Sequence, residues 1–201
     1  MKMFSRETIV LASGSPSRRA MLDAAGIAYE AIPAKIDERA LESEMDGADA
    51  AEIAQALAAA KAAAVSGSQP GKWVLGSDSL IEVAGKRYDK PTSREEAARH
   101  LREFSGRSMT LHSAAALSKD GRIDWIAEDF ARLAVRELSE EFIASYLDIE
   151  WPAVAGCVGV FRIEGPGPQL FDRINGDQFT ILGMPLLPVL SALRDREVLL
   201  A

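Results

Sequence analysis

The sequence predicts an α/β protein with one mixed sheet flanked by helices. Two observations support this class. Apolar, strand-like segments alternate along the chain with segments whose composition and end signals favour helices. Of the 201 residues, 48% are hydrophobic and 26% are charged, which is an ordinary globular composition. This length is enough for one large domain or for two small lobes that share a cleft.

The first predicted helix has clear signals at both ends. It follows a short buried strand over Thr8–Ala12. Ser15 is a suitable N-cap, and Pro16 stands at the first helical position, where its missing N–H costs nothing. Gly26 is a typical stop, so we expect the helix to end near Ala25.

The next segments are a short strand, a loop and a long helix. We predict a strand over Ile27–Pro33 and a charged loop from Lys35 to Asp49. The alanine-rich segment Ala48–Ser66 strongly favours a helix. Within it, Ile53, Leu57 and Lys61 share one face, so the lysine lies on the apolar stripe. It either extends past the core to solvent or points into a cleft.

The middle of the chain predicts a strand, a turn region and a capped helix. Lys72–Val83 is the most strand-like segment, with an interruption at Gly76–Ser79. Ala84–Ser93 is expected to turn. The following helix has a capping box, in which Ser93 and Glu96 are three residues apart, and it stops at Gly106.

The second half predicts two strands, a helix, a hairpin and a final helix. Apolar residues alternate from Met109 to Leu117, and a Lys-Asp-Gly turn leads into a second strand that ends at Val135. Ser139 opens a helix to about Leu147. The segment 167–182 resembles a hairpin around Asn175–Gly176, and a last helix follows Pro185 and ends near Arg194.

Charge and cysteine content narrow the classes of function. The net charge is −7 and the pI is near 5.0, so extended nucleic-acid binding, which needs a basic face, is not expected. A small anionic ligand remains compatible with a few converging cations. The single cysteine, Cys157, suits a reducing cytoplasm and is either a small buried residue or a nucleophile. No long apolar run predicts a membrane span, and the N-terminus lacks the apolar stretch of a signal peptide.

Three stretches could carry chemistry on an anion. Ser13, the amides at the first helix start and the forked guanidinium of Arg18 suit phosphate oxygens. Asp78 stands within an apolar strand, where a carboxylate is costly unless it is paired or holds a metal. Lys90 precedes a proline, which extends its backbone toward either a site or solvent. Together with Glu38, Asp78 could hold Mg²⁺, which accepts one or two carboxylates plus substrate phosphates.

Five ordered motifs carry a family resemblance over nearly the whole chain. They are "LASGSPSRRAMLDAAG", "IDE", "AAAKAAAV", the run from "VLGSDSLIEV" to "SGR", and "GDQFTILGMPLLPVLSALR". The sequence thereby resembles the Maf family of nucleoside triphosphate pyrophosphatases. The resemblance implies a Maf/ITPase-like fold in which residues 1–201 form a single elongated domain, with two lobes around a central cleft.

The resemblance also implies roles for individual residues. Asp78 matches the family's acidic catalytic residue, a proton acceptor, with Lys61 and Lys90 as further catalytic positions. Ser13 and Arg18 match positions around the triphosphate. Glu38 and Asp78 would hold the divalent metal, Mg²⁺ or Mn²⁺. The implied partner is a nucleoside triphosphate, with neither nucleic acid nor membrane, and a homodimer is a candidate assembly.

The resemblance points to two classes of substrate base. "SPSRRAML" and "GVFRIEG" are closer to the branch that takes 7-methyl-GTP, with Glu164 at its specificity position. A carboxylate suits a methylated guanine, which is positively charged and has donors at N1 and N2. Ser17 and Ser79, however, stand where that branch has tryptophan and glutamine, and the pyrimidine branch has arginine and threonine there.

Two other functions remain open from the sequence. One is a regulatory nucleotide-binding protein, because the family is also linked to inhibition of septum formation. The other is a monophosphatase that acts on an anionic metabolite. The products separate these functions, since a pyrophosphatase releases pyrophosphate and a monophosphatase releases orthophosphate.

Overall fold

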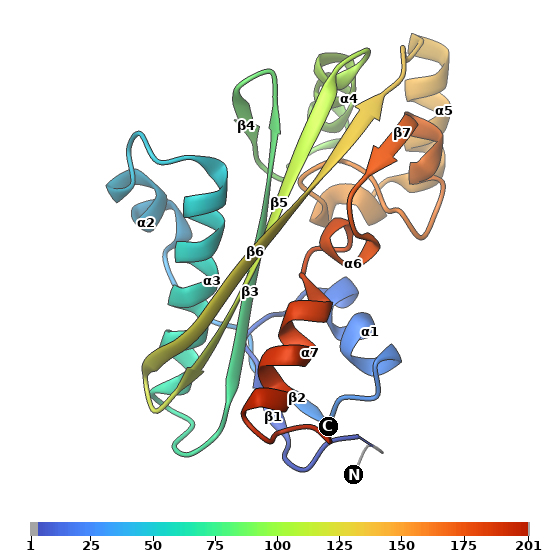
Figure 1. Ribbon diagram of the computed structural model, residues 1–201. Helices are drawn as coiled ribbons and strands as arrows, with labels where there is room; N and C mark the ends of the chain where they lie inside the picture. The colour runs from blue at the N-terminus through green and yellow to red at the C-terminus, as the bar shows by residue number, and fades with distance from the viewer. Residues whose placement is uncertain (1–3, 201) are drawn as a thin grey trace. The chain divides into compact units, whose positions relative to one another are not determined.

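A computed structural model describes residues 4–200, and its helices and strands alternate as the sequence predicts (Figure 1). The elements, in chain order, are β1 (Ile9–Leu11), α1 (Pro16–Ala24), β2 (Tyr29–Ala31), α2 (Glu38–Glu44), α3 (Ala50–Ser66), β3 (Val74–Val83), β4 (Lys86–Tyr88), α4 (Arg94–Phe104), β5 (Ser108–Lys119), β6 (Arg122–Val135), α5 (Glu140–Glu150), the 3₁₀ helices η1 (Ala153–Gly156) and η2 (Gly167–Leu170), β7 (Phe171–Asn175), α6 (Gln178–Ile181) and α7 (Leu186–Asp195).

The strands form one mixed sheet, which confirms the predicted class. Its hydrogen-bonded order is β2-β1-β3-β5-β6-β7, and β4 pairs with β3. β1 runs parallel to β2 and β3, whereas β3 and β4, and β6 and β7, are antiparallel. No helix within residues 4–200 has the length and apolar character needed to cross a membrane.

The chain divides into two compact units. The first unit takes in the described residues up to Ser79, His112–Asp129, and the chain from Gln178 onward. The second takes in Leu80–Leu111 and Phe130–Asp177. The three long strands β3, β5 and β6 each contribute residues to both units.

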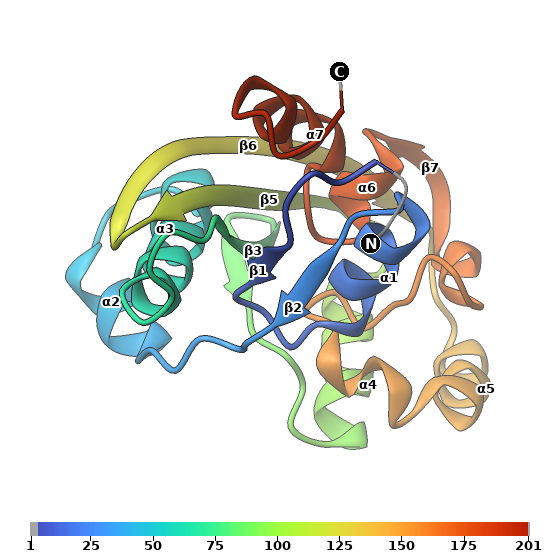
Figure 2. The same ribbon diagram turned by 90° about the horizontal axis from the view of Figure 1, so that it is seen from below.

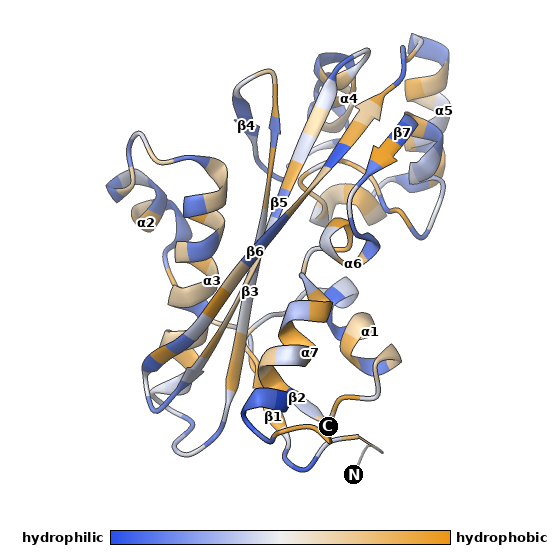
Figure 3. Ribbon diagram, in the orientation of Figure 1, coloured by the Kyte–Doolittle hydropathy of each residue, from blue (hydrophilic) through white to orange (hydrophobic). Residues whose placement is uncertain are grey.

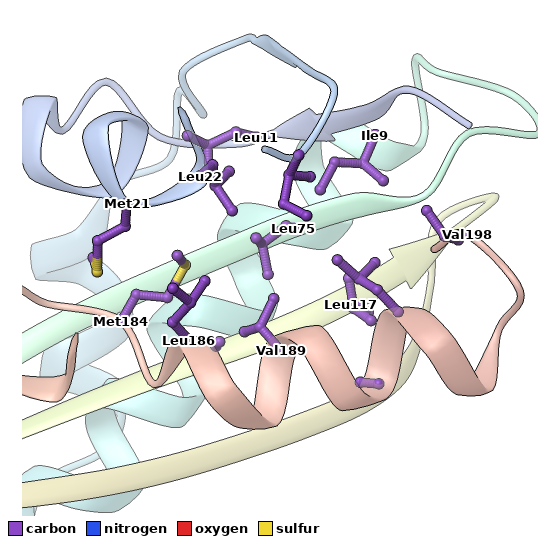
Figure 4. Packing of buried hydrophobic residues seen from close by; sticks show 14 of the residues in the cluster. Ile9, Leu11, Met21, Leu22, Leu75, Leu117, Met184, Leu186, Val189 and Val198 are labelled. Atoms are coloured by element: carbon purple, nitrogen blue, oxygen red, sulfur yellow. The ribbon is translucent and has the colours of Figure 1, made fainter. Parts of the chain in front are cut away.

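In the first unit, apolar side chains cover both faces of the sheet. Leu11 of β1 and Leu75 of β3 pack with residues of α1 and α7 in one core (Figure 4). Val10 and Val74 belong to a second core with Val65 of α3. Because successive strand residues point to opposite faces, these two cores lie on opposite sides of the sheet. Figure 2 shows α7 and α3, which contribute to the two cores, on different sides of β1 and β3.

The predicted helix ends are confirmed where local signals are strong. The Ser15 side chain caps α1, Pro16 is its first residue, and Gly26 follows it with φ of +70°. Asp49 and Glu52 form a capping box on α3, whose residues are largely in hydrophobic colours in Figure 3. The side chains of Ser93 and Ser139 cap α4 and α5 by accepting from the backbone N–H groups of Glu96 and Phe142. The predicted capping box on α4 is only half formed, because the Glu96 carboxylate accepts from Thr92.

The predicted loop over Lys35–Asp49 is wrong in its middle, because α2 forms there. The Asp37 side chain caps α2 by accepting a hydrogen bond from the backbone N–H of Ala40. The segment that follows contains mainly good helix formers. α2 has no buried residue, so it lacks the apolar periodicity that would have predicted it.

The predicted interruption of β3 at Gly76–Ser79 is also wrong. β3 continues through these residues because each polar side chain has a partner. Ser77 donates to the carbonyl oxygen of Gly183, the Ser79 hydroxyl lies 3.0 Å from the same oxygen and 2.9 Å from Ser113 Oγ, and Asp78 accepts from Lys61. The turn region that follows contains the short strand β4, joined to β3 through Ala84 and Gly85, which both have positive φ.

The predicted hairpin around Asn175–Gly176 does not form. β7 ends at Asn175 and pairs with β6, from which it is distant in the sequence. After Gly176 the chain turns into the short helix α6 rather than into a second strand. The Asn-Gly pair therefore marks a turn. β7 pairs with the distant strand β6, and not with a strand formed by the residues that follow Gly176.

Candidate active site

Strand β3 and helix α3 approach each other closely at Gly76. A Cβ atom at this position would lie 2.2 Å from the carbonyl oxygen of Ala58 and 2.6 Å from the backbone nitrogen of Ala62. Only a residue without a side chain permits this distance. Asp78 is two residues further along β3 and therefore points toward the same helix. Gly76 thus places the Asp78 carboxylate beside α3.

Lys61 of α3 meets that carboxylate. Its Nζ lies 2.6 Å from Oδ1 of Asp78 and 3.0 Å from Oε1 of Glu38, at the start of α2. Lys61 and Asp78 are each only 8% exposed, whereas half of the Glu38 side chain is accessible. Of the two interpretations of Lys61, extension to solvent is therefore excluded. Its ammonium is buried and paired with carboxylates, as burial of a charge requires.

Helix α1 supplies a second cation, Arg18. The guanidinium donates through Nε to the Gly183 carbonyl at 2.9 Å, through Nη1 to Ser13 Oγ at 3.2 Å and through Nη2 to Ser79 Oγ at 3.1 Å. These bonds use three of the five N–H donors of a guanidinium. They hold its plane in one orientation while leaving donors for a ligand.

The electrostatic surroundings of Arg18 connect it with the acidic residues. Burial lowers the pKa of the Arg18 guanidinium, and the negative charges of Asp78 and Glu38 oppose that shift. The two carboxylates that pair with Lys61 therefore also act on Arg18. The first unit consequently gathers two cations and two carboxylates into one polar site.

Ser79 lies in the hydrogen-bond network around Arg18. Its hydroxyl lies against Arg18, the Gly183 carbonyl and Ser113 Oγ, the last at 2.9 Å. Ser17 is half-buried on α1, next to Arg18. Ser79 is thus part of the support for the arginine.

Lys90 and Glu164 belong to the second unit. Both act on the thiol of Cys157 there: burial is the main cause that raises the Cys157 pKa, Glu164 raises it further, and Lys90 opposes the rise. A raised pKa disfavours the thiolate, so the environment of Cys157 does not activate it as a nucleophile. The same unit contains an ion pair between Arg162 and the buried Glu150, with two hydrogen bonds of 2.8 Å.

Two acidic residues of the first unit, Glu38 and Asp78, could serve a divalent metal. Among residues 4–200, no three or more His, Cys, Asp or Glu side chains gather in a metal-binding arrangement. Glu38 and Asp78 do converge, since both carboxylates contact the Lys61 ammonium. Two carboxylates are enough for Mg²⁺ when substrate phosphates complete its coordination. The donor set therefore fits a metal that arrives with a phosphorylated substrate.

Sequence reasoning missed three groups that support the site. Ser77 and Ser113 are fully buried and hydrogen-bonded, and the carbonyl of Gly183 accepts from Arg18. A serine inside an apolar strand is a weak signal for such a role. A backbone carbonyl gives no signal in the sequence, because every residue has one.

Several known proteins are similar to this chain. A family model described as "Maf-like protein" matches residues 8–196. The chain is 45% identical over 193 residues to the nucleoside triphosphate pyrophosphatase of Nitrobacter winogradskyi, covering 96% of each chain. It is also 45% identical over 190 residues to the 7-methyl-GTP pyrophosphatase of Mesorhizobium japonicum, covering 94% of this chain and 96% of that one. Among solved structures, the Ham1 protein of Staphylococcus aureus aligns with 95% of this chain and 100% of its own, at 15% identity and a TM-score of 0.46.

Proposed function

The chain belongs to the Maf family, and on that premise we propose that it hydrolyses nucleoside triphosphates to nucleoside monophosphates and pyrophosphate. Its relatives bear the names nucleoside triphosphate pyrophosphatase and 7-methyl-GTP pyrophosphatase. These names describe enzymes rather than regulatory binders. We further propose a cytoplasmic location, because a single cysteine suits a reducing compartment.

One observation carries the proposal: the buried contact of 2.6 Å between Lys61 and Asp78, with Glu38 on the same ammonium. A buried ion pair is often no more stabilising than apolar packing of the same volume. Such a pair is therefore better explained by chemistry than by stability. Arg18 adds a cation with free donors, which suits a polyphosphate.

Each residue of the site has its own role in the proposed reaction. Arg18 and Lys61 bind phosphate oxygens and neutralise part of their charge. A water oxygen forms a bond to one phosphorus of the α–β anhydride, and the bridging P–O bond breaks with its electron pair on the departing phosphate. The Asp78 carboxylate accepts the proton of that water. We place Lys90 among the groups that act on the triphosphate, as its family position implies.

We also propose that Glu38 and Asp78 hold Mg²⁺ or Mn²⁺ together with the substrate phosphates. When bound, the metal would neutralise phosphate charge and polarise the phosphoryl oxygens. The half-exposed Glu38 leaves the site accessible to a metal–nucleotide complex. Because the Lys61 ammonium contacts the same two carboxylates, a bound metal would share them with the lysine.

The preferred base is a finer part of the proposal. Glu164 suits 7-methyl-GTP, because its carboxylate attracts a positively charged base and accepts from N1 and N2. The small side chains of Ser17 and Ser79 replace larger groups of both substrate branches. We therefore include pyrimidine triphosphates as competing substrates, with 7-methyl-GTP as the first candidate.

The test is pyrophosphate release from UTP, TTP, CTP, GTP and 7-methyl-GTP, with Mg²⁺ or Mn²⁺ and after chelation with EDTA. The wild type and Asp78→Asn are compared. We expect metal-dependent release by the wild type and none by the variant, which should still bind nucleotide in calorimetry. Full activity of Asp78→Asn would remove Asp78 from the mechanism.

The same assay decides between the functions that the sequence left open. Orthophosphate as the first product would identify a monophosphatase. Nucleotide binding without release of either product would identify a regulatory binder. Strongest release with UTP or TTP would keep the enzyme and overturn the preference for the methylated base.

A further inference from the structure

More donors point at the carbonyl oxygen of Gly183 than it can accept. Ser77 Oγ lies at 3.1 Å, Ser79 Oγ at 3.0 Å and Arg18 Nε at 2.9 Å. A carbonyl oxygen has two lone pairs. One of the three donors must therefore direct its proton elsewhere.

Ser79 is the donor with an alternative. Its hydroxyl carries a single proton, and Ser113 Oγ lies 2.9 Å away. Ser113 donates its own proton to the carbonyl of Thr180 at 2.8 Å, so its lone pairs are available to accept. The Ser79 hydroxyl therefore donates its hydrogen bond to Ser113 Oγ.

This assignment satisfies every group in the network. The Gly183 carbonyl then accepts from Ser77 and from Arg18 Nε, which fills its two lone pairs. The oxygen of Ser79, with its proton turned away, accepts from Arg18 Nη2 at 3.1 Å. The Nε and Nη2 atoms of the guanidinium are thereby both held by hydrogen bonds.

We propose that Ser113 is a positioning residue that orients Arg18 toward the phosphates through Ser79. The inference rests on the proposed function. Ser113 is fully buried, so it acts on the substrate only through other residues. Without its hydroxyl, the Ser79 proton returns to the Gly183 carbonyl and competes there with Arg18 Nε. The guanidinium then loses its defined plane.

The experiment compares Ser113→Ala with Ser118→Ala. Ser118 is a matched control, because it is also fully buried on β5 and its hydroxyl donates to a carbonyl, that of Arg122, at 2.9 Å. The first readout is the steady-state kinetics of pyrophosphate release. The second is the dissociation constant for inorganic triphosphate, measured by calorimetry, which requires no turnover.

We expect Ser113→Ala to raise KM and the triphosphate dissociation constant about tenfold, the scale of one hydrogen bond to a charged group, with a smaller change in kcat. Ser118→Ala should leave both constants near their wild-type values. In an Arg18→Ala background, adding Ser113→Ala should change neither constant further, because the residue through which Ser113 acts is gone. Thermal unfolding of each variant verifies that it is folded.

Two results would overturn the inference. One is equal constants for the Ser113→Ala and Ser118→Ala variants. The other is the same loss with and without Arg18, which would mark a general structural effect. A wild type that releases no pyrophosphate would refute the proposed function instead, and the triphosphate constants would still decide the role of Ser113.

Discussion

A methyl group at position 76 would push strand β3 away from helix α3. In the structure, the Cβ of Gly76→Ala would lie 2.2 Å from the Ala58 carbonyl oxygen and 2.9 Å from the Ala62 side chain. The first of these atoms is backbone and has no rotamer that relieves the contact. The strand or the helix must therefore move as a whole.

The size of that movement follows from the contact distances. Ordinary contacts to a Cβ begin at 3.4 Å, so relief of the overlap requires a separation of about 1 Å in an interior that is packed densely. Overpacking of this kind costs about 1–3 kcal/mol of unfolding free energy. The same movement separates Lys61 from Asp78, and a displacement of about 1 Å at a reacting group can reduce the rate about 100-fold.

The assay combines stability with activity. Urea unfolding gives the loss of free energy, and pyrophosphate release gives kcat/KM under conditions where the variant is fully folded. Gly67→Ala is the matched control. Gly67 lies at the C-cap of the same helix, has φ of −60°, and its Cβ would meet nothing nearer than 3.9 Å.

We expect Gly76→Ala to lose both stability and activity and Gly67→Ala to lose neither. The reasoning would be refuted by a folded Gly76→Ala protein with wild-type kcat/KM, because the ion pair would then tolerate the displacement. A loss of activity equal in both variants would also contradict it, since only one of them separates the helix from β3.

Two further predictions concern the second unit. Glu164→Gln should change the preference between 7-methyl-GTP and the pyrimidine triphosphates more than the overall rate, because it removes charge but little volume; an unchanged substrate profile would exclude Glu164 from base selection. His100 is buried against the rings of Tyr88 and Phe104, and its Nδ1 has no hydrogen-bond partner among the described residues. Burial, more than the nearby Arg99, lowers its pKa below the ordinary 6.5. The unfolded state therefore takes up a proton at a higher pH than the folded state, and the free energy of unfolding should fall as the pH drops through about 6.5. His100→Leu should weaken that dependence in urea unfolding at pH 7.5 and 5.5, and an unweakened dependence would contradict the assignment.

Several features of the fold could be predicted because their signals are local. The cap at Ser15 and the stop at Gly26 bound α1 wherever the rest of the chain lies. The alanine-rich composition of α3 likewise favours a helix wherever the rest of the chain lies. By contrast, α2 was missed because it buries nothing, and β7 was missed because its partner β6 is distant in the sequence.

By itself, the sequence determined the fold class, the main helix boundaries and, through its motifs, the family. Only the tertiary structure decided which partners the candidate residues Lys61, Asp78 and Arg18 contact. The pairing of Lys61 with Asp78 depends on the close approach at Gly76, and the support of Arg18 depends on the Gly183 carbonyl, 165 residues further along the chain. The physical reason is that helix caps, stops and side-chain spacing depend only on residues close together in the sequence. The partner of a buried charge depends instead on the packing of segments that are far apart in the sequence.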